Sequence, residues 1–563
     1  MVIFSPAICA ARRTLSVVGI PSLGAGLLLG IAFVGFRNVN PLNISWLLGG
    51  NDATAHQLSF EFFRDAPLFQ WPPTATPGLI SGSGQVLASA NGLFGIPAKV
   101  IGLVVEERFQ FYGIWICLLF GFQGFFAERL LSVYIPRRLI AVSSSVLYLI
   151  APAFVSRIGF SHYELAAHFL ILWSLYLIAT DKTSYRAWSF LLLSTMLVSI
   201  YLWTMIVVLF FTHHTLRFSK EPRLVTARNV VSQSIVPLTL SAAGFFFVGY
   251  ASYSENAAGS GVFRANFLTY FNPISESGAT MSPITTWLSP LGERNLTSQE
   301  VEGFNFLGLG PLILLTVLLI MIVWKRRVEM VFHPIVFVST VSLFLYSLTN
   351  SVVIARRETT VWWPSPLVSL LEIFRSAARF SWPLYYVLIT TAIVACFRLL
   401  KPQVFKPMIF IVLALAAIDS RNLFSHAQTE TFAKPTSAQV FVDEKWTSVA
   451  VGRKSIELVP TFDLLTDGLS AELDQYRNLW DELENYAVSN DLSTNFGFVP
   501  RSVERYATSR NAQNETELQS GRLDPGKIYV VLDSERWARY KQNLGSRATA
   551  ITLDGMNLIF STK

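Results

Sequence analysis

The stretch NDATAHQLSFEFFRD, which begins at residue 51, holds the first side chains whose types and spacing could do chemistry. Asp52 and His56 are four residues apart, so on a helix they share one face. A carboxylate in that setting is suited to act as a general base toward a hydroxyl group, with His56 orienting it. The spacing of Glu61, Arg64 and Asp65 predicts a local set of ion pairs. The alternative interpretation is that all five are solvated loop charges.

A second group lies in RIGFSHYELAAHFLILW, which begins at residue 157. His162 and Glu164 are expected at the mouth of an apolar helix, and His168 further inside it. Ionisable residues within a membrane span are costly and are usually paired or line a polar cavity. We therefore expect His168 to be a neutral imidazole that hydrogen-bonds to a neighbouring helix. For Glu164, a structural role and a role as a second acidic group near Asp52 both stay open.

A third group lies in SLLEIFRSAARFSWPLYY, where Glu372 precedes Arg375 and Arg379. The two arginines are four residues apart, which places them on one face of a predicted helix. Two guanidinium groups at the membrane surface are suited to clamp a phosphate or diphosphate carried by a lipid. The alternative is contact with anionic headgroups.

A fourth group, QEVEGFNFLGLG, holds Glu300 and Glu302, which could contact a sugar or a metal ion. Gly308 and Gly310, further along, favour close helix packing. The patterns GxxxxGK[ST], HExxH, GxSxG and CxxC do not occur, which argues against nucleotide hydrolysis, zinc proteolysis and serine hydrolysis. The three cysteines are widely spaced, so the sequence predicts neither disulfide staples nor zinc knuckles.

The elements that must position these groups are apolar helices. The chain has 563 residues, of which 52% are hydrophobic and only 14% charged, whereas soluble globular proteins carry about 25% charged residues. A transmembrane helix needs roughly 20 mostly apolar residues. We expect about eleven such spans, at 14–36, 110–132, 139–156, 162–180, 187–199, 201–217, 233–254, 306–325, 333–350, 382–400 and 407–420. Residues 187–217 could instead form one bent helix.

The basic residues predict the orientation of these spans. Positive charge in short loops marks the cytoplasmic side of a membrane protein. Counted from the N-terminus, every basic cluster falls on one face if the N-terminus is cytoplasmic: Arg12, Arg13, Arg129, Arg137, Arg138, Lys182, Arg186, Arg217, Lys220, Arg223, Arg228, Lys325, Arg326, Arg327, Arg398, Lys401 and Lys406. The pI near 9.2 reflects this distribution, and nothing indicates a nucleic-acid partner.

The remaining sequence gathers on the opposite, external face. Three external segments are too long for plain turns, namely 37–109, 255–305 and 351–381. Apolar patches in the first of them suit helices that lie in the membrane interface. We expect a transmembrane domain over 1–420 and a water-soluble external domain over 421–563. In the latter, a helical stretch at 469–491 and strand-like runs at 527–533, 548–554 and 556–561 predict an α/β fold.

Six ordered blocks carry a resemblance that covers nearly the whole chain. They are NDATAHQLSFEFFRDAPLFQWP, QFYGIWICLLFGFQGFFAERLL, GFSHYELAAHFLILWSLYL, VEGFNFLGLG, FRSAARFSWPLYY and STNFGFVPR. Together they resemble a family of bacterial multi-spanning membrane proteins, and that family is similar to the GT-C superfamily of glycosyltransferases. The resemblance therefore implies a GT-C-like α-helical polytopic fold, followed by an extracytoplasmic α/β domain.

The resemblance also implies a reaction. An enzyme of this kind moves a sugar, such as the pentose arabinofuranose, from a polyprenyl-phosphate donor to an envelope glycan or a surface protein such as pilin, at the external face of the bacterial cytoplasmic membrane. In this sequence Asp52 takes the position of the catalytic base, next to His56. Arg375 and Arg379 take the positions of the ligands to the lipid phosphate. Supporting roles fall to His162, Glu164, Arg64 and Glu302. Because the first loop holds the single Asp52 and no DxD pair, the sequence does not indicate a metal ion.

Three other functions stay open at this stage. Many spans with scattered polar groups also suit a lipid or glycan transporter, although transporters usually carry repeated halves and ionisable residues near mid-membrane. An O-antigen ligase or polymerase also uses lipid-linked sugars and external arginines. A non-catalytic envelope assembly factor could use residues 421–563 as a binding module. The residues do not select the sugar or the acceptor.

Overall fold

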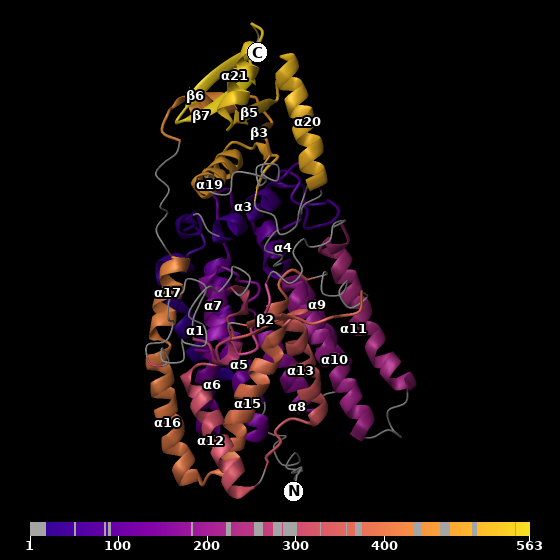
Figure 1. Ribbon diagram of the computed structural model, residues 1–563, viewed down its shortest axis with the longest axis vertical. Helices are drawn as coiled ribbons and strands as arrows, with labels where there is room; N and C mark the ends of the chain where they lie inside the picture. The colour runs from indigo at the N-terminus through magenta and orange to yellow at the C-terminus, as the bar shows by residue number, and fades with distance from the viewer. Residues whose placement is uncertain are drawn as a thin grey trace. The chain divides into compact units, whose positions relative to one another are not determined.

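Two compact units make up the chain in the computed structural model, whose helices and strands are labelled in Figure 1. Unit 1 comprises Met1–Pro41, Phe111–Gly244 and Asn256–Thr431, and unit 2 comprises Leu42–Gln110, Phe245–Glu255 and Phe432–Lys563. The structure describes residues 18–49, 52–83, 86–87, 92–181, 184–220, 227–252, 263–273, 284, 301–326, 328–355, 357–365, 374–432, 441–461, 473–497, 504–546 and 548–562.

Unit 1 is built from helices. Those described are α1 (Ile20–Val34), α2 (Phe36–Val39), α5 (Tyr112–Tyr134), α6 (Arg138–Leu149), α7 (Pro152–Gly159), α8 (Phe169–Ala179), α9 (Tyr185–Val198), α10 (Ile200–Lys220), α11 (Ala227–Phe247), α12 (Leu309–Lys325), α13 (Pro334–Ser347), α15 (Trp382–Leu399), α16 (Pro402–Asp419) and α17 (Arg421–Thr431). The last turn of α11 belongs to unit 2. One short hairpin joins β1 (Ser351–Ile354) to β2 (Arg357–Thr360) in antiparallel pairing.

Three helices among the described residues are long and apolar enough to cross a membrane, namely Tyr112–Tyr134, Ala377–Leu399 and Pro402–Asp419. A fourth crossing results if α6 and α7, which meet at an angle of 42°, are taken as one broken span. The expectation of about eleven spans is therefore not supported. Length and composition of these helices still indicate a membrane protein.

The excess in the predicted number has a local cause. An apolar helix coincides with each predicted span, but several of these helices are shorter than a bilayer crossing requires: α1 has 15 residues, α8 has 11 and α9 has 14. Hydropathy reports how apolar a segment is, whereas capping and breaks decide how long its helix becomes. The run over 187–217, for instance, is interrupted at Ser199, whose extended backbone ends α9 before α10 begins.

Small residues bring α1 and α5 into close contact. A Cβ atom added at Gly26 would lie 2.2 Å from the carbonyl oxygen of Phe120, and one at Gly124 would lie 2.3 Å from that of Ser22. Polar groups join the same pair of helices, because Ser22 N donates to the buried carboxylate of Glu128 at 3.1 Å. Close approach through glycine is the usual way for membrane helices to gain packing energy.

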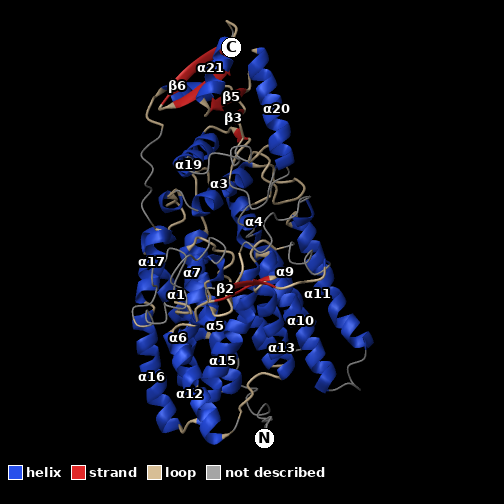
Figure 2. Cartoon of the chain, viewed as in Figure 1, coloured by secondary structure: helices blue, strands red, loops and turns tan. Residues whose placement is uncertain are grey.

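Unit 2 contains a five-stranded mixed sheet, seen as red arrows near the C-terminus in Figure 2. The strand order is β4-β3-β5-β7-β6. Strand β3 (Ser455–Val459) pairs in parallel with β4 (Ser493–Thr494) and β5 (Lys527–Val531), while β7 (Met556–Ser561) pairs antiparallel with β5 and with β6 (Ala548–Leu553). The helices of this part are α18 (Lys445–Ala450), α19 (Leu473–Ser489), α20 (Glu504–Ser520) and α21 (Ser534–Gln542). The predicted α/β pattern is confirmed.

The core of unit 2 also draws on the segment predicted as the first external loop. In that segment α3 (Asp52–Asp65) and α4 (Gly92–Ile101) are helical. Leu58 and Leu79 are buried in one cluster with Leu458 and Leu483 from the C-terminal part. The compact unit therefore begins at Phe432 in the C-terminal part of the chain and includes residues 42–110, in contrast to the division predicted at residue 420. Most of the predicted external segment 255–305 lies outside the described residues.

Candidate functional site

The side chain of Glu302 lies between two arginines from distant parts of unit 1. Nη2 of Arg379 donates a hydrogen bond to Glu302 Oε1 at 2.6 Å, and Nε of the same guanidinium donates to Oε2 at 3.1 Å. Nη1 of Arg157 donates a further hydrogen bond to Oε2. Bidentate pairing of this kind is among the stronger charge-assisted hydrogen-bond geometries. We refer to Arg157, Glu302 and Arg379 as the arginine–glutamate centre.

Three short elements position these side chains. Arg157 occupies the last turn of α7, Glu302 lies on the 3₁₀ turn η5 (Val301–Gly303), and Arg379 lies on the 3₁₀ turn η6 (Ala377–Ser381). Side-chain hydrogen bonds join the segments that follow η5 and η6. Trp382 Nε1 donates to Asn305 Oδ1 at 2.8 Å, and the Tyr385 hydroxyl donates to the carbonyl of Phe306 at 3.1 Å. Two of the sequence blocks quoted above therefore hold each other in place.

Burial and the two cations act in opposite directions on the carboxyl group of Glu302. The residue is only 7% exposed, and burial by itself raises the pKa of its carboxyl group. The positive charges of Arg379 and Arg157, with a smaller contribution from His162, outweigh burial and hold that pKa well below its ordinary value of 4.5. Glu302 is therefore ionised throughout the physiological pH range.

Arg157 is the member of the centre that the sequence analysis missed. Its side chain is 1% exposed, and its Nε and Nη2 atoms have no hydrogen-bond partner among the residues that the structure describes. Buried guanidinium donors without a partner are uncommon, because leaving them unpaired costs free energy. A signal was present in the sequence, since Arg157 is a lone charge within the apolar run APAFVSRIGF.

The predicted placement of Arg375 and Arg379 on one helical face is wrong, whereas their binding of a phosphate stays a prediction. Arg375 lies in a bend before η6 and is exposed, with its guanidinium carbon 5.0 Å from the ring centroid of Phe263. Arg379 is mostly buried, and its guanidinium carbon lies 4.5 Å from the ring centroid of Tyr201. The physical reason lies in the backbone, because Ser376 N donates to the Tyr201 hydroxyl at 3.2 Å and helical structure begins only at Ala377.

Two further predicted site residues lie near the arginine–glutamate centre. Nδ1 of His162 is 3.8 Å from Glu302 Oε1 and 3.4 Å from Arg157 Nη1. The carboxylate of Glu164 is close enough to Arg379 for an electrostatic interaction. The structure therefore brings together His162, Glu164, Glu302 and Arg379, which the sequence analysis had placed in three separate groups.

His168 packs in the core of unit 1. It is fully buried, and its Nδ1 lies 2.7 Å from the hydroxyl of Tyr386 on α15. Gln123 Nε2 from α5 donates to the same hydroxyl at 3.0 Å. The predicted hydrogen bond to a neighbouring helix is confirmed, and the contacts give His168 a structural role.

Asp52 and His56 lie on α3, in unit 2. Asp52 is the first residue of the helix and is partly buried, whereas His56 is only 6% exposed. Their helical spacing is as predicted, because both fall within the first five residues of one regular helix. The arginine–glutamate centre belongs to unit 1, so the role of Asp52 as a base stays a prediction.

The charges at the other end of α3 form an ion-pair network. Glu61 is fully buried, accepts a hydrogen bond from Arg108 Nε at 3.1 Å and lies 3.3 Å from Arg64 Nη1. Arg64 Nε also donates to Asp65 Oδ1 at 3.0 Å. The predicted local set is confirmed, with Arg108 as an added member. Arg64 is thus engaged with protein carboxylates inside unit 2.

Two acidic residues of the sequence analysis, Glu300 and Glu372, lie outside the described residues. Within the described ranges, no group of three or more His, Cys, Asp or Glu side chains is arranged to hold a metal ion. Each oxygen of Glu302 accepts at least one hydrogen bond from a guanidinium, and its expected contact with a sugar or a metal stays a prediction.

These observations define a largely helical protein that has three helices of membrane-crossing length among its described residues and a small mixed sheet in its C-terminal part. Residues 23–421 match the family described as domain of unknown function (DUF6311), and residues 445–561 match the DUF6311 C-terminal domain. The chain therefore belongs to the DUF6311 family. No curated protein matches its sequence.

Proposed function

We propose that the chain is an integral-membrane glycosyltransferase that moves a sugar from a polyprenyl-phosphate donor to an extracytoplasmic acceptor. The observation that carries this proposal is the arginine–glutamate centre, because it holds two guanidinium groups in a buried setting at the ends of apolar helices. The sequence blocks resemble a family of bacterial multi-spanning membrane proteins, and the similarity of that family to GT-C transferases supports the same class. The acceptor is an envelope glycan or a surface protein.

The centre is suited to hold the phosphate of the donor. Arg157 keeps two nitrogen atoms, Nε and Nη2, without a protein partner among the described residues, and Arg379 is fixed by Glu302 with its guanidinium against Tyr201. Preorganised donors in a buried site stabilise negative charge without further rearrangement. In this proposal both guanidiniums stabilise the phosphate as it leaves, and Glu302 holds them in position.

The base of the proposed reaction is Asp52, with His56 one turn further along α3. Its carboxylate takes the proton of the acceptor hydroxyl while the acceptor oxygen forms a bond to the anomeric carbon of the sugar. The bond from that carbon to the phosphate oxygen breaks at the same time, and its electron pair leaves with the polyprenyl phosphate. A single displacement of this kind inverts the anomeric centre, and it requires neither a covalent intermediate nor a second nucleophile.

The proposal places the active side outside the cytoplasm. We propose that the chain resides in a bacterial cytoplasmic membrane, with its N-terminus in the cytoplasm and residues 421–563 on the external side. The distribution of lysine and arginine supports this orientation. The interacting molecules are then the lipid-linked sugar, the acceptor and the surrounding lipids.

A transfer assay with the full-length protein in lipid nanodiscs tests this function. The donors are short-chain polyprenyl phosphates that carry tritiated mannose, glucose or arabinofuranose, and the acceptor is an envelope fraction from a strain lacking the gene. We expect label to enter the acceptor fraction with one of these donors. We expect Asp52→Asn to lower the rate by roughly 10²- to 10⁴-fold, the range for loss of a general base.

The matched control is Asp65→Asn at the opposite end of α3. Asp65 is exposed and pairs only with Arg64 among the ion pairs described, so its loss removes one surface ion pair of small energetic value. We expect this variant to keep the wild-type rate. Equal activity of the two variants, or no transfer from any donor by folded protein, would contradict the proposal.

A further inference from the structure

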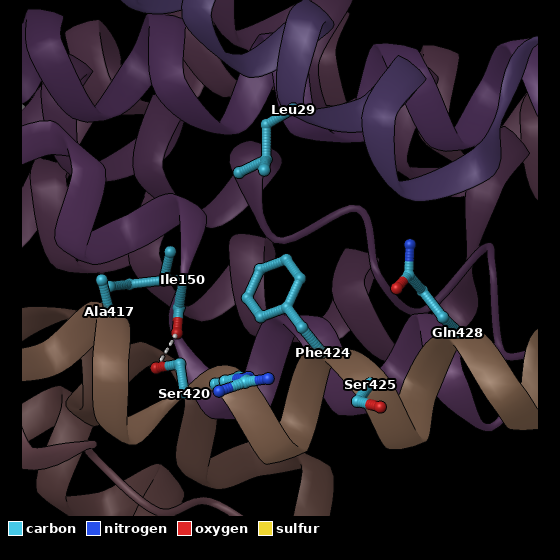
Figure 3. A pocket seen from close by; sticks show the side chains of 8 residues that line it. Leu29, Ile150, Ala417, Ser420, Phe424, Ser425 and Gln428 are labelled. Carbon is cyan, nitrogen blue, oxygen red and sulfur yellow. Dashed lines mark hydrogen bonds between the residues drawn. The ribbon is translucent and has the colours of Figure 1, made fainter.

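A groove of about 420 Å³ lies within unit 1 where α16 ends and α17 begins (Figure 3). Its volume falls in the range of about 300–1,000 Å³ that is usual for small-molecule sites. The apolar part of the lining consists of Leu29, Ile150, Ala417 and Phe424. Ser420, Arg421, Ser425 and Gln428 form the polar part.

Hydrogen bonds and close helix packing fix the walls of this groove. Ser420 Oγ donates to the carbonyl of Ile150, which lies at the break between α6 and α7, at 3.5 Å (Figure 3). Gln428 Nε2 donates to the carbonyl of Phe33 at the end of α1 at 3.0 Å. The segment from Ser420 to Gln428 is therefore hydrogen-bonded to the α6–α7 break at one end of the groove and to α1 at the other.

The helix that leads into the groove has an apolar surface that the protein leaves uncovered. α16 is one of the three helices of membrane-crossing length among the described residues, and only 28% of this helix is buried inside the protein. Ile411 is 60% exposed and Ile418 is 55% exposed. In a bilayer this surface contacts lipid hydrocarbon, and Ala417, the neighbour of Ile418, lines the groove.

The polar part of the groove carries one cation that is available to an anion. Arg421 is exposed and forms no ion pair with any residue that the structure describes. The nearest acid in the sequence, Asp419, accepts hydrogen bonds from the backbone N–H groups of Ile284 and Leu309, each at 3.3 Å. Among the residues that the structure describes, no acidic side chain lines the groove. A guanidinium beside a serine hydroxyl, here that of Ser425, is well suited to a phosphate.

We propose that this groove binds an anionic phospholipid of the surrounding membrane, with an acyl chain against Ile150, Ala417 and Phe424 and the phosphate on Arg421. This lipid site is inferred from the apolar lining, the exposed face of α16 and the charge of Arg421. It does not rest on the proposed transferase activity, and it concerns residues other than those of the arginine–glutamate centre.

Photo-crosslinking of the full-length protein in nanodiscs tests this site. The probe is phosphatidylglycerol with a diazirine in its acyl chain, and the readout is mass spectrometry of peptides from α16 and α17. We expect labelling of residues that line the groove, and a loss of roughly tenfold in Arg421→Gln, because one charge-assisted contact is worth about that factor in affinity. Arg421→Lys keeps the positive charge and should retain part of the labelling.

Two pairs of variants distinguish labelling in the groove from labelling by general contact with lipid. Ala417→Phe fills the apolar part and should abolish labelling of α17, whereas Ala414→Phe, one turn earlier and also exposed but outside the groove, should leave it unchanged. Lys401→Gln removes an exposed cation at the opposite end of α16 and should have no effect.

Three results would overturn the proposal. One is equal labelling by the same probe built on phosphatidylcholine, which removes the role of charge. Another is an equal loss of labelling in the control variants and the groove variants. The third is preferential labelling by a diazirine-bearing polyprenyl phosphate in competition with phosphatidylglycerol, which would assign the groove to a different lipid.

Discussion

The carboxylate of Glu302 and the guanidinium of Arg379 form a two-point pair in which Nε and Nη2 donate to separate oxygens, at 3.1 Å and 2.6 Å. The two residues are 77 positions apart in the chain. Such a pair fixes the plane of the guanidinium as well as its position. Since Arg157 donates to the same carboxylate, one acidic residue orients both cations of the centre.

A double-mutant cycle at this pair should reveal strong coupling. We expect Glu302→Gln alone to lower the free energy of unfolding by about 3–5 kcal/mol, because two buried guanidiniums lose their counter-ion. Combining it with Arg379→Gln should cost less than the sum of the single changes, by about 1–3 kcal/mol. Thermal unfolding in nanodiscs measures the stability of the wild type, the two single variants and the double variant. Strict additivity would show that the pair contributes nothing beyond its separate members.

The stabilisation from Glu302 should depend on pH in one direction. Its pKa in the folded protein lies below the ordinary value of 4.5, so its contribution is fully present above pH 4.5 and is lost as the pH falls through the folded pKa. We expect the difference in melting temperature between wild type and Glu302→Gln to be constant near neutral pH and to shrink under acid conditions. A difference that stays constant down to strongly acidic pH would contradict this assignment.

Glu484 should show the opposite behaviour. It is 2% exposed on α19, and burial, with a smaller contribution from Asp481, raises the pKa of its carboxyl group well above 4.5. Burial of the Glu484 carboxyl group lowers the free energy of unfolding because it disfavours ionisation. This loss of stability is absent below pH 4.5 and grows as the pH rises toward the pKa in the folded protein. We expect Glu484→Gln to raise the melting temperature at neutral pH by about 2–4 °C, as a gain of about 1 kcal/mol does in domains of moderate size.

The neighbouring residue Glu482 supplies the control for this change. Glu482→Gln alters the same charge two residues earlier on α19, at a partly exposed position. We expect no comparable rise in melting temperature for this variant. If the melting temperature rises equally in both variants, the rise is caused by the change in the net charge of the helix, and burial of Glu484 is not its cause.

Two glycines of α1 allow a test of how α1 packs on α5. Gly26→Ala would place a Cβ atom 2.2 Å from the carbonyl oxygen of Phe120, whereas Gly24→Ala meets no atom within 4 Å. Both changes bring the same gain in helix propensity, about 1 kcal/mol. We therefore expect Gly24→Ala to be neutral or stabilising and Gly26→Ala to destabilise by about 1–3 kcal/mol through overpacking. Denaturation of the solubilised protein, followed by tryptophan fluorescence, measures the difference.

A strain that lacks the gene should lose one sugar from its envelope glycans or surface proteins. This follows from the proposed transfer reaction, and mass spectrometry of both fractions detects it. Complementation with wild type should restore the missing pentose or hexose, whereas Asp52→Asn should not. Restoration by Asp52→Asn at wild-type level would favour a non-catalytic role in envelope assembly.

Local patterns in the sequence predicted the secondary structure well. The helix at α19, the strands β5, β6 and β7, and an apolar helix within each predicted span follow from periodicity and hydropathy, which act over a few residues. The ion pairs of Glu61 and Arg64 also followed from spacing on one helix. What failed was the count of membrane crossings, because helix length depends on breaks such as those at Ser199 and Ile150.

The site was predictable only in part, because its members meet through tertiary contacts. Glu302, His162 and Arg379 were chosen from separate segments, and no spacing rule joins residues 162, 302 and 379. Arg157 pairs with Glu302, which lies 145 positions further along the chain, and no spacing rule predicts that contact. Arg375 and Arg379 were assigned to one helix face since the sequence does not show that the Ser376 amide bonds to Tyr201.

The discontinuous composition of unit 2 has a consequence for biogenesis. Leu58 and Leu79 are synthesised early, yet they are buried against Leu458 and Leu483, which emerge only when translation is almost complete. During most of translation, the segment from Leu42 to Gln110 therefore lacks the C-terminal part of its core, and some of its apolar side chains stay exposed. A chaperone has a long period in which to bind this segment, and a nonsense mutation upstream of Phe432 would leave it permanently without its core.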